Sequence, residues 1–315
     1  MDQKELLHFP KRALFVVNPV AGRKTIQKHL PDCVRALMDA GYLVTTMVTA
    51  ERGEATQYAK TYGKFYDLVV CAGGDGTLNE TVTGLAESHA NVPVGYIPCG
   101  TTNDFSASHG LPKDIPGAMQ GIVSEQRARY DVGCFADQYF VGVALFGAFS
   151  WMAYTTEQTK KNKLGYHAYV LDGVRDLSRL KPIHMRLEAD GTTLEDDYLF
   201  GAVSNAYNLG GYLDLSATGV VLSDGILELV LVKAPRSLPE LDQLLRAITA
   251  GDFTGHWLTL RHVKNMKVHN PPELQWSLDG EKSGCYESVE IHALPGFLEL
   301  QGGKQKRRCW NESNF

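Results

Sequence analysis

The residues best suited to chemistry lie in one short stretch, in which three glycines surround an aspartate. The run Gly73-Gly74-Asp75-Gly76 follows an apolar segment, residues 67–72, that we predict to be a buried strand, and a helical pattern begins near Thr77. Glycine lets the backbone approach a ligand closely, and the first turn of a helix offers N–H groups to an anion. A carboxylate beside bound phosphates is unfavourable unless it binds a metal ion or accepts from a hydrogen-bond donor. The stretch therefore predicts a site for Mg²⁺-bound nucleotide, with Asp75 as an exposed loop carboxylate.

Two simpler or more familiar interpretations fit this stretch less well. A tight turn between strand and helix would need only two glycines. The sequence has no G-x-x-x-x-G-K-[ST] pattern, and Asn79 stands where G-x-G-x-x-G requires its last glycine. The phosphate site is therefore predicted to be neither a Walker loop nor a dinucleotide fingerprint.

The elements that must position this stretch alternate between strand and helix. A helix is expected to open at Pro31 and to close at Gly41, and another covers residues 54–62. This order is typical of a doubly wound parallel sheet, in which ligands bind at the carboxyl ends of the strands. The predicted strands cover residues 12–18, 42–49, 67–72 and 92–98.

Two further loops at strand ends carry glycine together with polar residues. One follows the first strand, from Asn18 to Gly22, and the other follows the fourth strand, over residues 99–105. Each alone would be ordinary turn chemistry. Because the carboxyl ends of parallel strands share one edge of the sheet, we expect all three loops to converge on one crevice.

The second part of the chain has short β-type runs in place of the alternation. From about residue 127 it is predicted to form a mainly antiparallel β-sandwich, with one long helical pattern over residues 154–180. We expect a nucleotide-binding α/β domain over residues 1–126 and a sandwich domain over residues 127–297. The C-terminal segment, about residues 298–315, is a candidate to pack back on the first domain.

Composition excludes several classes of protein. Hydrophobic residues make up 44% of the 315 residues and charged residues 21%, as in ordinary globular domains. The net charge of −5 argues against a general nucleic-acid binder, and no apolar run approaches the roughly 20 residues of a membrane span. The six cysteines form no C-x-x-C pair. We therefore expect a cytoplasmic protein with reduced thiols, no signal peptide and no zinc site.

These motifs together resemble the diacylglycerol kinase catalytic family, and most closely its soluble bacterial lipid kinases. The glycine–aspartate stretch alone is shared with NAD kinases and 6-phosphofructokinases. The additional Asn18-Pro19 and the late Asp279-Gly280-Glu281 make the resemblance more specific. The matching pieces occur in the family's order and are Asn18-Pro19 with Gly22, residues 73–80, residues 100–105, Ser223-Asp224-Gly225 and Asp279-Gly280-Glu281.

The resemblance implies roles for individual residues. It places ATP between the two domains, gives Glu281 the role of general base toward a lipid hydroxyl, and makes Asp75 a second catalytic residue. It also implies a structural Mg²⁺ site, held by the carboxylate of Asp224 and the carbonyls of Val221 and Ile226. The residues implied to bind the nucleotide are Asn18, Thr49, Gly73, Gly74, Asp75, Gly76, Thr77, Leu78, Asn79 and Thr101.

Three positions depart from the family's pattern. Val221 stands where some relatives have aspartate, Gly142 where asparagine is frequent, and Ser216-Ala217 where the family has Ala-Pro. The departure at Val221 concerns the implied structural metal site, and the other two concern the implied lipid-binding site. From spacing alone, Glu281 would be an ordinary residue of an Asp-Gly hairpin turn, and only the resemblance makes it catalytic.

We therefore predict an ATP- and Mg²⁺-dependent lipid kinase of phospholipid metabolism, which acts on diacylglycerol or a related lipid. It would be cytoplasmic and peripheral at the inner membrane face, and the resemblance is compatible with a homodimer. Residues 145–154, followed by lysines 160, 161 and 163, could dock on an anionic membrane, although core packing is the favoured interpretation. The alternatives are a kinase of a soluble alcohol such as NAD, or a nucleotide-binding regulatory protein with little turnover.

Overall fold

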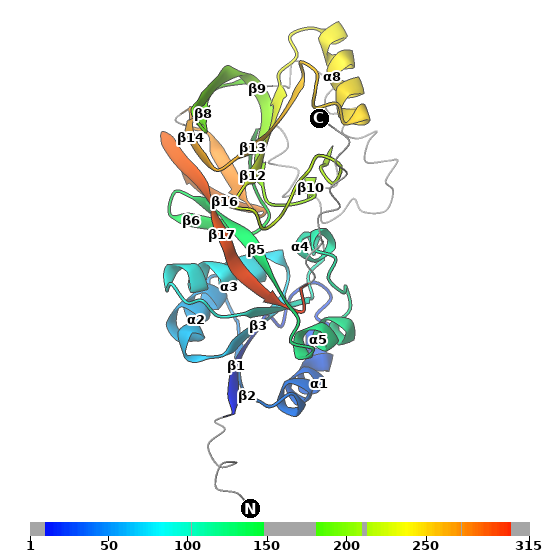
Figure 1. Ribbon diagram of the computed structural model, residues 1–315, viewed down its shortest axis with the longest axis vertical. Coiled ribbons are helices and arrows are strands. Elements are labelled where there is room, and N and C mark those ends of the chain that lie inside the picture. The colour runs from blue at the N-terminus through cyan, green and yellow to red at the C-terminus, as the bar shows by residue number, and fades with distance from the viewer. Residues whose placement is uncertain (1–9, 102, 148–180, 210–212, 272, 304–315) are drawn as a thin grey trace, which may run out of the picture.

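The computed structural model describes residues 10–101, 103–147, 181–209, 213–271 and 273–303. The long axis of the molecule carries an α/β half at one end and a β-rich half at the other (Figure 1). The predicted helix over residues 154–180, the lysines beside it and most of the aromatic run 145–154 lie outside the described residues. The predicted fold class, a doubly wound parallel sheet followed by an antiparallel sandwich, is confirmed.

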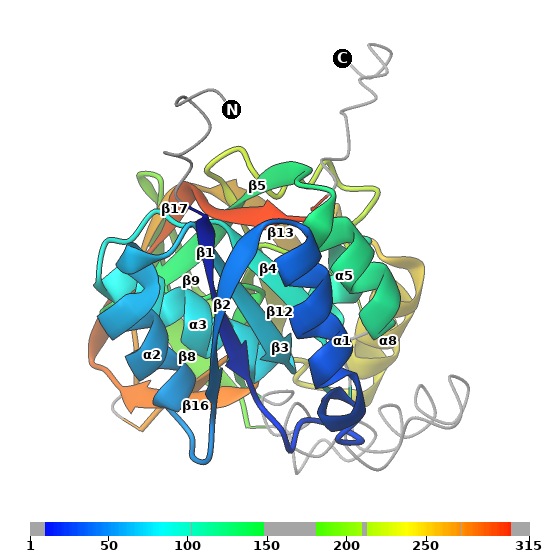
Figure 2. The ribbon, with the colours of Figure 1, turned by 90° about the horizontal axis from the view of Figure 1, so that it is seen from below.

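The first half is a parallel sheet in the order β4-β3-β1-β2. Helices α1 and α5 cover one face and α2 and α3 the other, as the view along the sheet shows (Figure 2). Every residue of β3 is buried, as expected of a strand covered on both faces. The elements are β1 (Lys11–Val17), α1 (Ile26–Asp39), β2 (Tyr42–Val48), α2 (Glu54–Tyr62), η2 (Gly63–Phe65), β3 (Leu68–Gly73), α3 (Asp75–Glu87), β4 (Val94–Pro98), α4 (Asp104–Ser108) and α5 (Ile115–Val123).

The prediction that Pro31 opens a helix is wrong. Helix α1 already begins at Ile26, which is fully buried and starts the apolar face that continues through Cys33. Pro31 lies on the exposed face, where water can bond the carbonyl that the proline ring leaves without an amide partner. The expected end of the helix is confirmed, because Gly41 follows it at φ +89°.

The second half is mainly antiparallel. Its main strand order is β16-β15-β7-β9-β8-β14-β17, while β12 and β13 branch from β9, and β5 and β6 branch from β17. Trp276 is fully buried in its core. The elements are β5 (Arg127–Phe135), β6 (Gln138–Phe140), β7 (Val143–Gly147), β8 (Ile183–Ala189), β9 (Thr192–Ser204), β10 (Asn208–Leu209), β11 (Leu213–Asp214), β12 (Leu227–Lys233), α8 (Leu238–Ala250), β13 (Leu258–Val263), β14 (Asn265–His269), β15 (Gln275–Leu278), β16 (Glu281–Cys285) and β17 (Ser288–Gln301).

The last strand, β17, connects the two halves. Its beginning pairs antiparallel with β14, its length with β5, and its end runs parallel to β4, with Leu300 opposite Val94. Helix α5 ends at Val123 and β5 begins at Arg127. One continuous sheet therefore passes from the α/β half into the sandwich.

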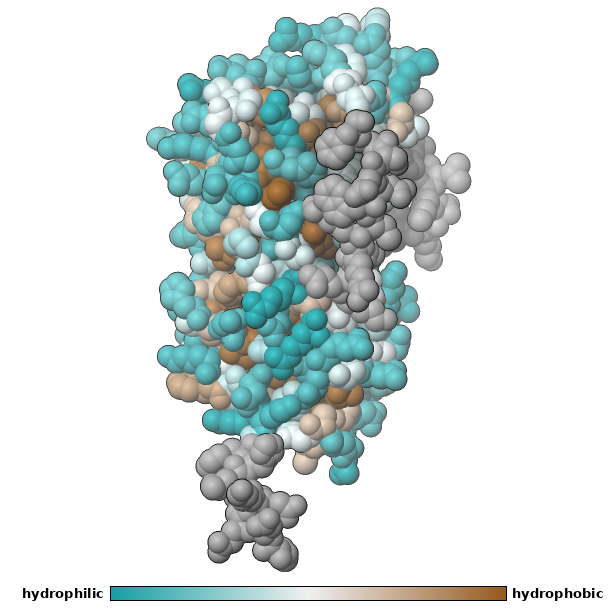
Figure 3. All heavy atoms as spheres, viewed as in Figure 1, coloured by the Kyte–Doolittle hydropathy of each residue, from teal (hydrophilic) through white to brown (hydrophobic). Residues whose placement is uncertain are grey.

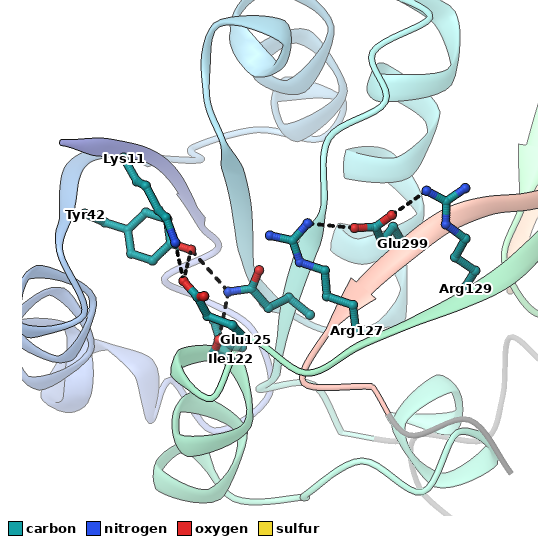
Figure 4. A network of polar contacts seen from close by, with 8 residues as sticks. Lys11, Tyr42, Ile122, Glu125, Arg127, Arg129 and Glu299 are labelled. Carbon is teal, nitrogen blue, oxygen red and sulfur yellow. Dashed lines mark hydrogen bonds and ion pairs between the residues drawn. The ribbon is translucent and has the colours of Figure 1, made fainter. Parts of the chain in front are cut away.

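A polar network surrounds this junction (Figure 4). Glu299 accepts hydrogen bonds from Arg127 at 2.8 Å and from Arg129 at 2.7 Å. The buried side chain of Gln301 donates to the carbonyl of Ile122 at 2.8 Å. Charged and amide groups thus fasten the end of β17 to β5 and to the end of α5.

No helix among the described residues combines the length and the apolar character that a bilayer crossing requires. On the face shown in Figure 3, hydrophobic residues form separate patches among hydrophilic ones.

Candidate active site

A cleft of about 1080 Å³ receives residues from both halves of the molecule. The first half contributes the loops that follow β1, β2, β3 and β4. The second half contributes the start of β7, the middle of β9 and the turn that ends at Glu281. The predicted convergence of the glycine loops at the carboxyl edge of the parallel sheet is therefore observed, and its volume suits a nucleotide with part of a second substrate.

The loops pack backbone against backbone. A Cβ atom added at Gly100 would lie 2.6 Å from the Cα of Gly74, and one added at Gly22 would lie 2.3 Å from the carbonyl oxygen of Cys99. Helix α3 starts at this point, with Gly74 as its N-cap residue, and its first-turn amides have no acceptor within the helix. This arrangement fits the phosphate groups of a nucleotide.

The loop after β1 is locked onto the start of α3. The Asn18 amide nitrogen donates to the hydroxyl of Thr77 at 3.1 Å, while its oxygen accepts the N–H of Val20 at 3.1 Å. A Cβ atom at Gly73 would lie 2.4 Å from the same Thr77 hydroxyl. Asn18, Gly73 and Thr77 thus form one tightly packed unit behind the glycine turn.

Asp75 is half-buried, so its predicted exposure is wrong. Its carboxylate accepts the N–H of Asp104 at 2.9 Å and that of Phe105 at 3.2 Å, at the start of α4. The hydroxyl of Tyr96 lies 3.5 Å away, and burial, together with the charge of Asp75, raises the pKa of Tyr96 well above its usual value. Asp75 therefore joins two of the glycine loops, and its carboxylate is a type of ligand that Mg²⁺ accepts.

Asp279 ties the second half to α3. Its carboxylate accepts the backbone N–H groups of Val141 at 2.7 Å, Gly142 at 2.9 Å and Val143 at 2.8 Å, and the side-chain amide of Asn79 at 2.8 Å. Burial raises the pKa of Asp279, and these donors act in the opposite direction. Four directed bonds thus fix the turn that carries the candidate base.

The glycine at position 142 has a local explanation. A Cβ atom there would lie 3.0 Å from Oδ1 of Asp279, closer than most real Cβ contacts. Glycine at this position leaves room for the carboxylate to collect three successive N–H groups. A larger residue would require the Asp279 side chain to shift.

Glu281 stands directly beside the glycine turn. Its Oε1 lies 3.9 Å from the position that a Cβ atom of Gly76 would occupy, and its side chain is 50% exposed. Oε2 forms an ion pair with Arg52, from the loop between β2 and α2. The carboxylate is therefore within the cleft and faces both the glycine turn and a cation.

The predicted nucleotide-binding residues fall into two layers. Gly73, Leu78 and Asn79 lie behind the cleft surface, and the side chain of Leu78 is fully buried in the core. The others line the cleft directly, and they are Asn18, Thr49, Gly74, Asp75, Gly76, Thr77 and Thr101.

The predicted structural metal ligands lie apart from the cleft. The N–H of Ile226 donates to Oδ1 of Asp224 at 3.2 Å, and the nearby carboxylate of Asp131 bonds the N–H groups of Gly225 and Gly296, each at 2.6 Å. Among the residues that the structure describes, no three acidic, histidine or cysteine side chains cluster as metal ligands. One carboxylate with carbonyls suits a largely hydrated Mg²⁺ ion, which is the coordination that this ion accepts in proteins.

Two features of the cleft were not predicted from the sequence. One is Arg52, whose only sequence signal is its position just after Thr49. The other is an apolar wall from the second half, whose members come from separate segments and have no common motif. This wall consists of Val141, Val143, Leu145, Phe200, Ala202 and Leu209.

Comparison with known proteins places this geometry in a family. Residues 12–135 match the diacylglycerol kinase catalytic domain, and residues 146–302 match the YegS C-terminal NAD kinase beta sandwich-like domain. The chain is 32% identical over 276 residues to the diacylglycerol kinase of Staphylococcus aureus strain bovine RF122 / ET3-1, and the match covers 87% of each chain. The chain therefore belongs to the diacylglycerol kinase family.

Solved structures from Bacillus anthracis str. Sterne show the same architecture. One putative diacylglycerol kinase is 27% identical, with a TM-score of 0.76, over 93% of this chain and 97% of that chain. A second, with the same coverage, is 26% identical with a TM-score of 0.75. Membership of this family makes the chain a kinase, and kinases of this family use ATP.

Proposed function

We propose that the chain is an ATP- and Mg²⁺-dependent lipid kinase that phosphorylates a hydroxyl of diacylglycerol or a related lipid. The observation that carries the proposal is the position of Glu281. Its carboxylate lies beside Gly76, at the junction between the glycine turn and the apolar wall. A hydroxyl presented from the apolar side would meet the phosphate presented from the glycine side at this carboxylate.

The chain's own residues have distinct tasks in this proposal. The glycine turn and the start of α3 hold the phosphates. Asp75 would hold Mg²⁺, and the bound ion would supply positive charge to neutralise the transferred group. Glu281 takes the proton of the lipid hydroxyl while that oxygen bonds to the γ-phosphorus. The bond from this phosphorus to the bridging oxygen breaks, and ADP leaves with its electron pair.

The apolar wall supports a lipid over a soluble alcohol such as NAD. Leu145 and Phe200 line the same cleft as Glu281, on the side of the second half. The polar groups of a sugar or nicotinamide ring would find no hydrogen-bond partners on these apolar side chains, whereas acyl chains are removed from water there. We propose residues 127–297 as the lipid-substrate domain and residues 1–126 as the nucleotide-binding domain.

The proposed substrate sets where the enzyme works. A lipid hydroxyl is presented at a bilayer surface, so we propose a cytoplasmic protein that associates peripherally with the inner membrane face. A structural Mg²⁺ at Asp224 and a homodimeric assembly belong to the same proposal by family resemblance.

The test is transfer of labelled γ-phosphate from ATP to lipids in anionic vesicles, with NAD as a soluble acceptor. Lipids to compare are diacylglycerol, monoacylglycerol, phosphatidylglycerol, ceramide, a sphingoid base and a polyprenol. We expect label in a glycerolipid, lost in Glu281→Gln and retained in Glu273→Gln, which makes the same chemical change at an exposed position. Label only in NAD, or ATP binding without any transfer, would overturn the proposal.

A further inference from the structure

The ion pair between Arg52 and Glu281 crosses the cleft. Arg52 belongs to the α/β half and Glu281 to the first residue of β16 in the sandwich, and both line the same cleft as the glycine turn. Because Oε1 of Glu281 lies 3.9 Å from the Cβ position of Gly76, the guanidinium on Oε2 is close to where phosphates would lie. The pair therefore stands between the two proposed substrates.

The backbone around Arg52 is held in place on both sides. The carboxylate of Glu54 accepts the N–H of Ala50 at 2.6 Å and that of Glu51 at 3.2 Å. The N–H of Gly53 donates to Glu80, on α3, at 3.0 Å. The Arg52 side chain is nevertheless 69% exposed. The loop is fixed relative to the glycine turn, and the guanidinium can change partners by side-chain rotation alone.

The ion pair conflicts with the proposed role of Glu281. The guanidinium on Oε2 stabilises the negative charge of the whole carboxylate, so Glu281 accepts a proton from a lipid hydroxyl less readily while the pair lasts. A largely exposed ion pair is weak, however, and its partners exchange readily. A phosphate group offers more charge than a carboxylate and matches the fork of the guanidinium, so it competes well for the same arginine.

We propose that Arg52 binds the terminal phosphate of the nucleotide and gives up Glu281 when it does so. Arg52 holds Glu281 until a terminal phosphate competes for its guanidinium. When Arg52 moves to that phosphate, its positive charge leaves the carboxylate, so Glu281 accepts a proton readily only when a phosphoryl group is in place. This inference rests on the proposed kinase function and deepens it, because it assigns a further phosphate-binding residue and a coupling between the two substrates.

The experiment is calorimetric titration with Mg²⁺ and either a non-hydrolysable ATP analogue or ADP. For Arg52→Gln we expect about tenfold weaker binding of the analogue, which corresponds to one lost charged hydrogen bond, and less than about twofold change for ADP. Arg52→Lys should retain part of the analogue affinity. Arg35→Gln is the matched control, because Arg35 forms an exposed pair with Asp39 on α1, and it should change neither affinity.

The competition makes a second, independent measurement possible. Glu281→Gln removes the rival partner of Arg52, so it should bind the analogue at least as tightly as the unmodified chain does. Adding Arg52→Gln to Glu281→Gln should restore weak analogue binding. Circular dichroism of each variant verifies folding.

The outcomes separate this inference from the proposed function. If the unmodified chain binds neither nucleotide, the proposed kinase function fails. If it binds both, and Arg52→Gln weakens both equally or neither, the kinase proposal stands and Arg52 is only a structural partner of Glu281. Weaker binding of the analogue to Glu281→Gln would also contradict the exchange.

Discussion

The two walls of the cleft are built in different ways. The nucleotide wall is built around backbone: Gly22 and Gly100 lie against neighbouring main-chain atoms and leave no space for a side chain, and polar side chains such as that of Asn18 surround them. The apolar wall, which we propose as the lipid wall, consists of side chains, such as Leu145 and Phe200, that project from separate strands of the sandwich. A backbone site fixes one shape, whereas a side-chain site can change its shape without changing the fold. Under the proposed function, the nucleotide wall would set the reaction and the lipid wall would set the choice of substrate.

The strongest test of this division is Glu281→Gln, at the boundary between the walls. Removal of the general base should lower turnover by about 10²–10⁴-fold. Nucleotide affinity should not fall, because the glycine turn remains intact. Steady-state transfer rates and calorimetric titration measure the two effects, with Glu273→Gln as the control. Near-normal turnover would remove Glu281 from the mechanism.

Asp279→Asn should damage the connection between the walls. An amide places N–H groups against backbone donors such as Val141 N–H, and buried donors without acceptors destabilise by about 1–3 kcal/mol. We expect a loss of about 2 kcal/mol in the free energy of unfolding in urea, together with lower turnover. Asp190→Asn is a matched control, since Asp190 also begins an Asp-Gly turn and accepts two N–H groups, but at an exposed site. Equal losses at both sites would refute a special role for Asp279.

Gly100→Ala tests whether the nucleotide wall tolerates added atoms. The new Cβ would lie 2.6 Å from the Cα of Gly74, so the loops must separate, at a cost of about 1–3 kcal/mol. Nucleotide binding should weaken accordingly, as measured by calorimetry. Gly121→Ala is the control, because its Cβ would be 3.4 Å from the nearest atom and alanine suits a helix. Unchanged affinity in Gly100→Ala would mean that the loops are not closely packed.

Leu145→Ala should affect only the lipid wall. Loss of part of an apolar contact raises the KM for lipid by about tenfold and leaves the KM for ATP unchanged. The same substitution at Leu43, which is 58% exposed on β2, should alter neither constant. A change in the KM for ATP alone would contradict the separation of the walls.

The smallest expected effect concerns Mg²⁺ outside the cleft. Without nucleotide, Mg²⁺ at millimolar concentration should raise the Tm by about 2 °C through binding to the folded state. Asp224→Asn should abolish this rise while turnover changes little. The same rise in the variant would place the ion elsewhere.

The convergence of the glycine loops on one cleft could be predicted from the sequence, because each loop directly follows a strand and the rule for parallel sheets brings strand ends together. Sequence reasoning was less successful where the packing of distant segments decides which residues are buried. Asp75 is half-buried because α4 folds over it, which no local pattern shows, and Ile26 extends α1 past Pro31 because it is needed in the core.

The mainly antiparallel character of the second half was predicted from the sequence, but the limits of its strands were not. Residues 288–292 and 297–300 form one strand, because pairing with β5 resumes on both sides of the irregularity between Leu294 and Leu298. Residues 258–269 form two strands, β13 and β14, since Lys264 donates its N–H to Asp190 between them. The polar edge strand β16 has no apolar alternation and was missed. Such features depend on partners distant in sequence.

The path of β17 affects how the protein can fold while the ribosome is still making it. Strand β4 has its neighbour β3 early in synthesis, but its other edge is completed only by Leu300 and Gln301. At about 5–20 residues per second, a ribosome needs on the order of 10–40 s to make the roughly 200 residues between them. During that interval the parallel sheet has an open edge, which is a template for wrong pairing. The sheet that joins the two halves is thus completed only when Leu300 and Gln301 have been made.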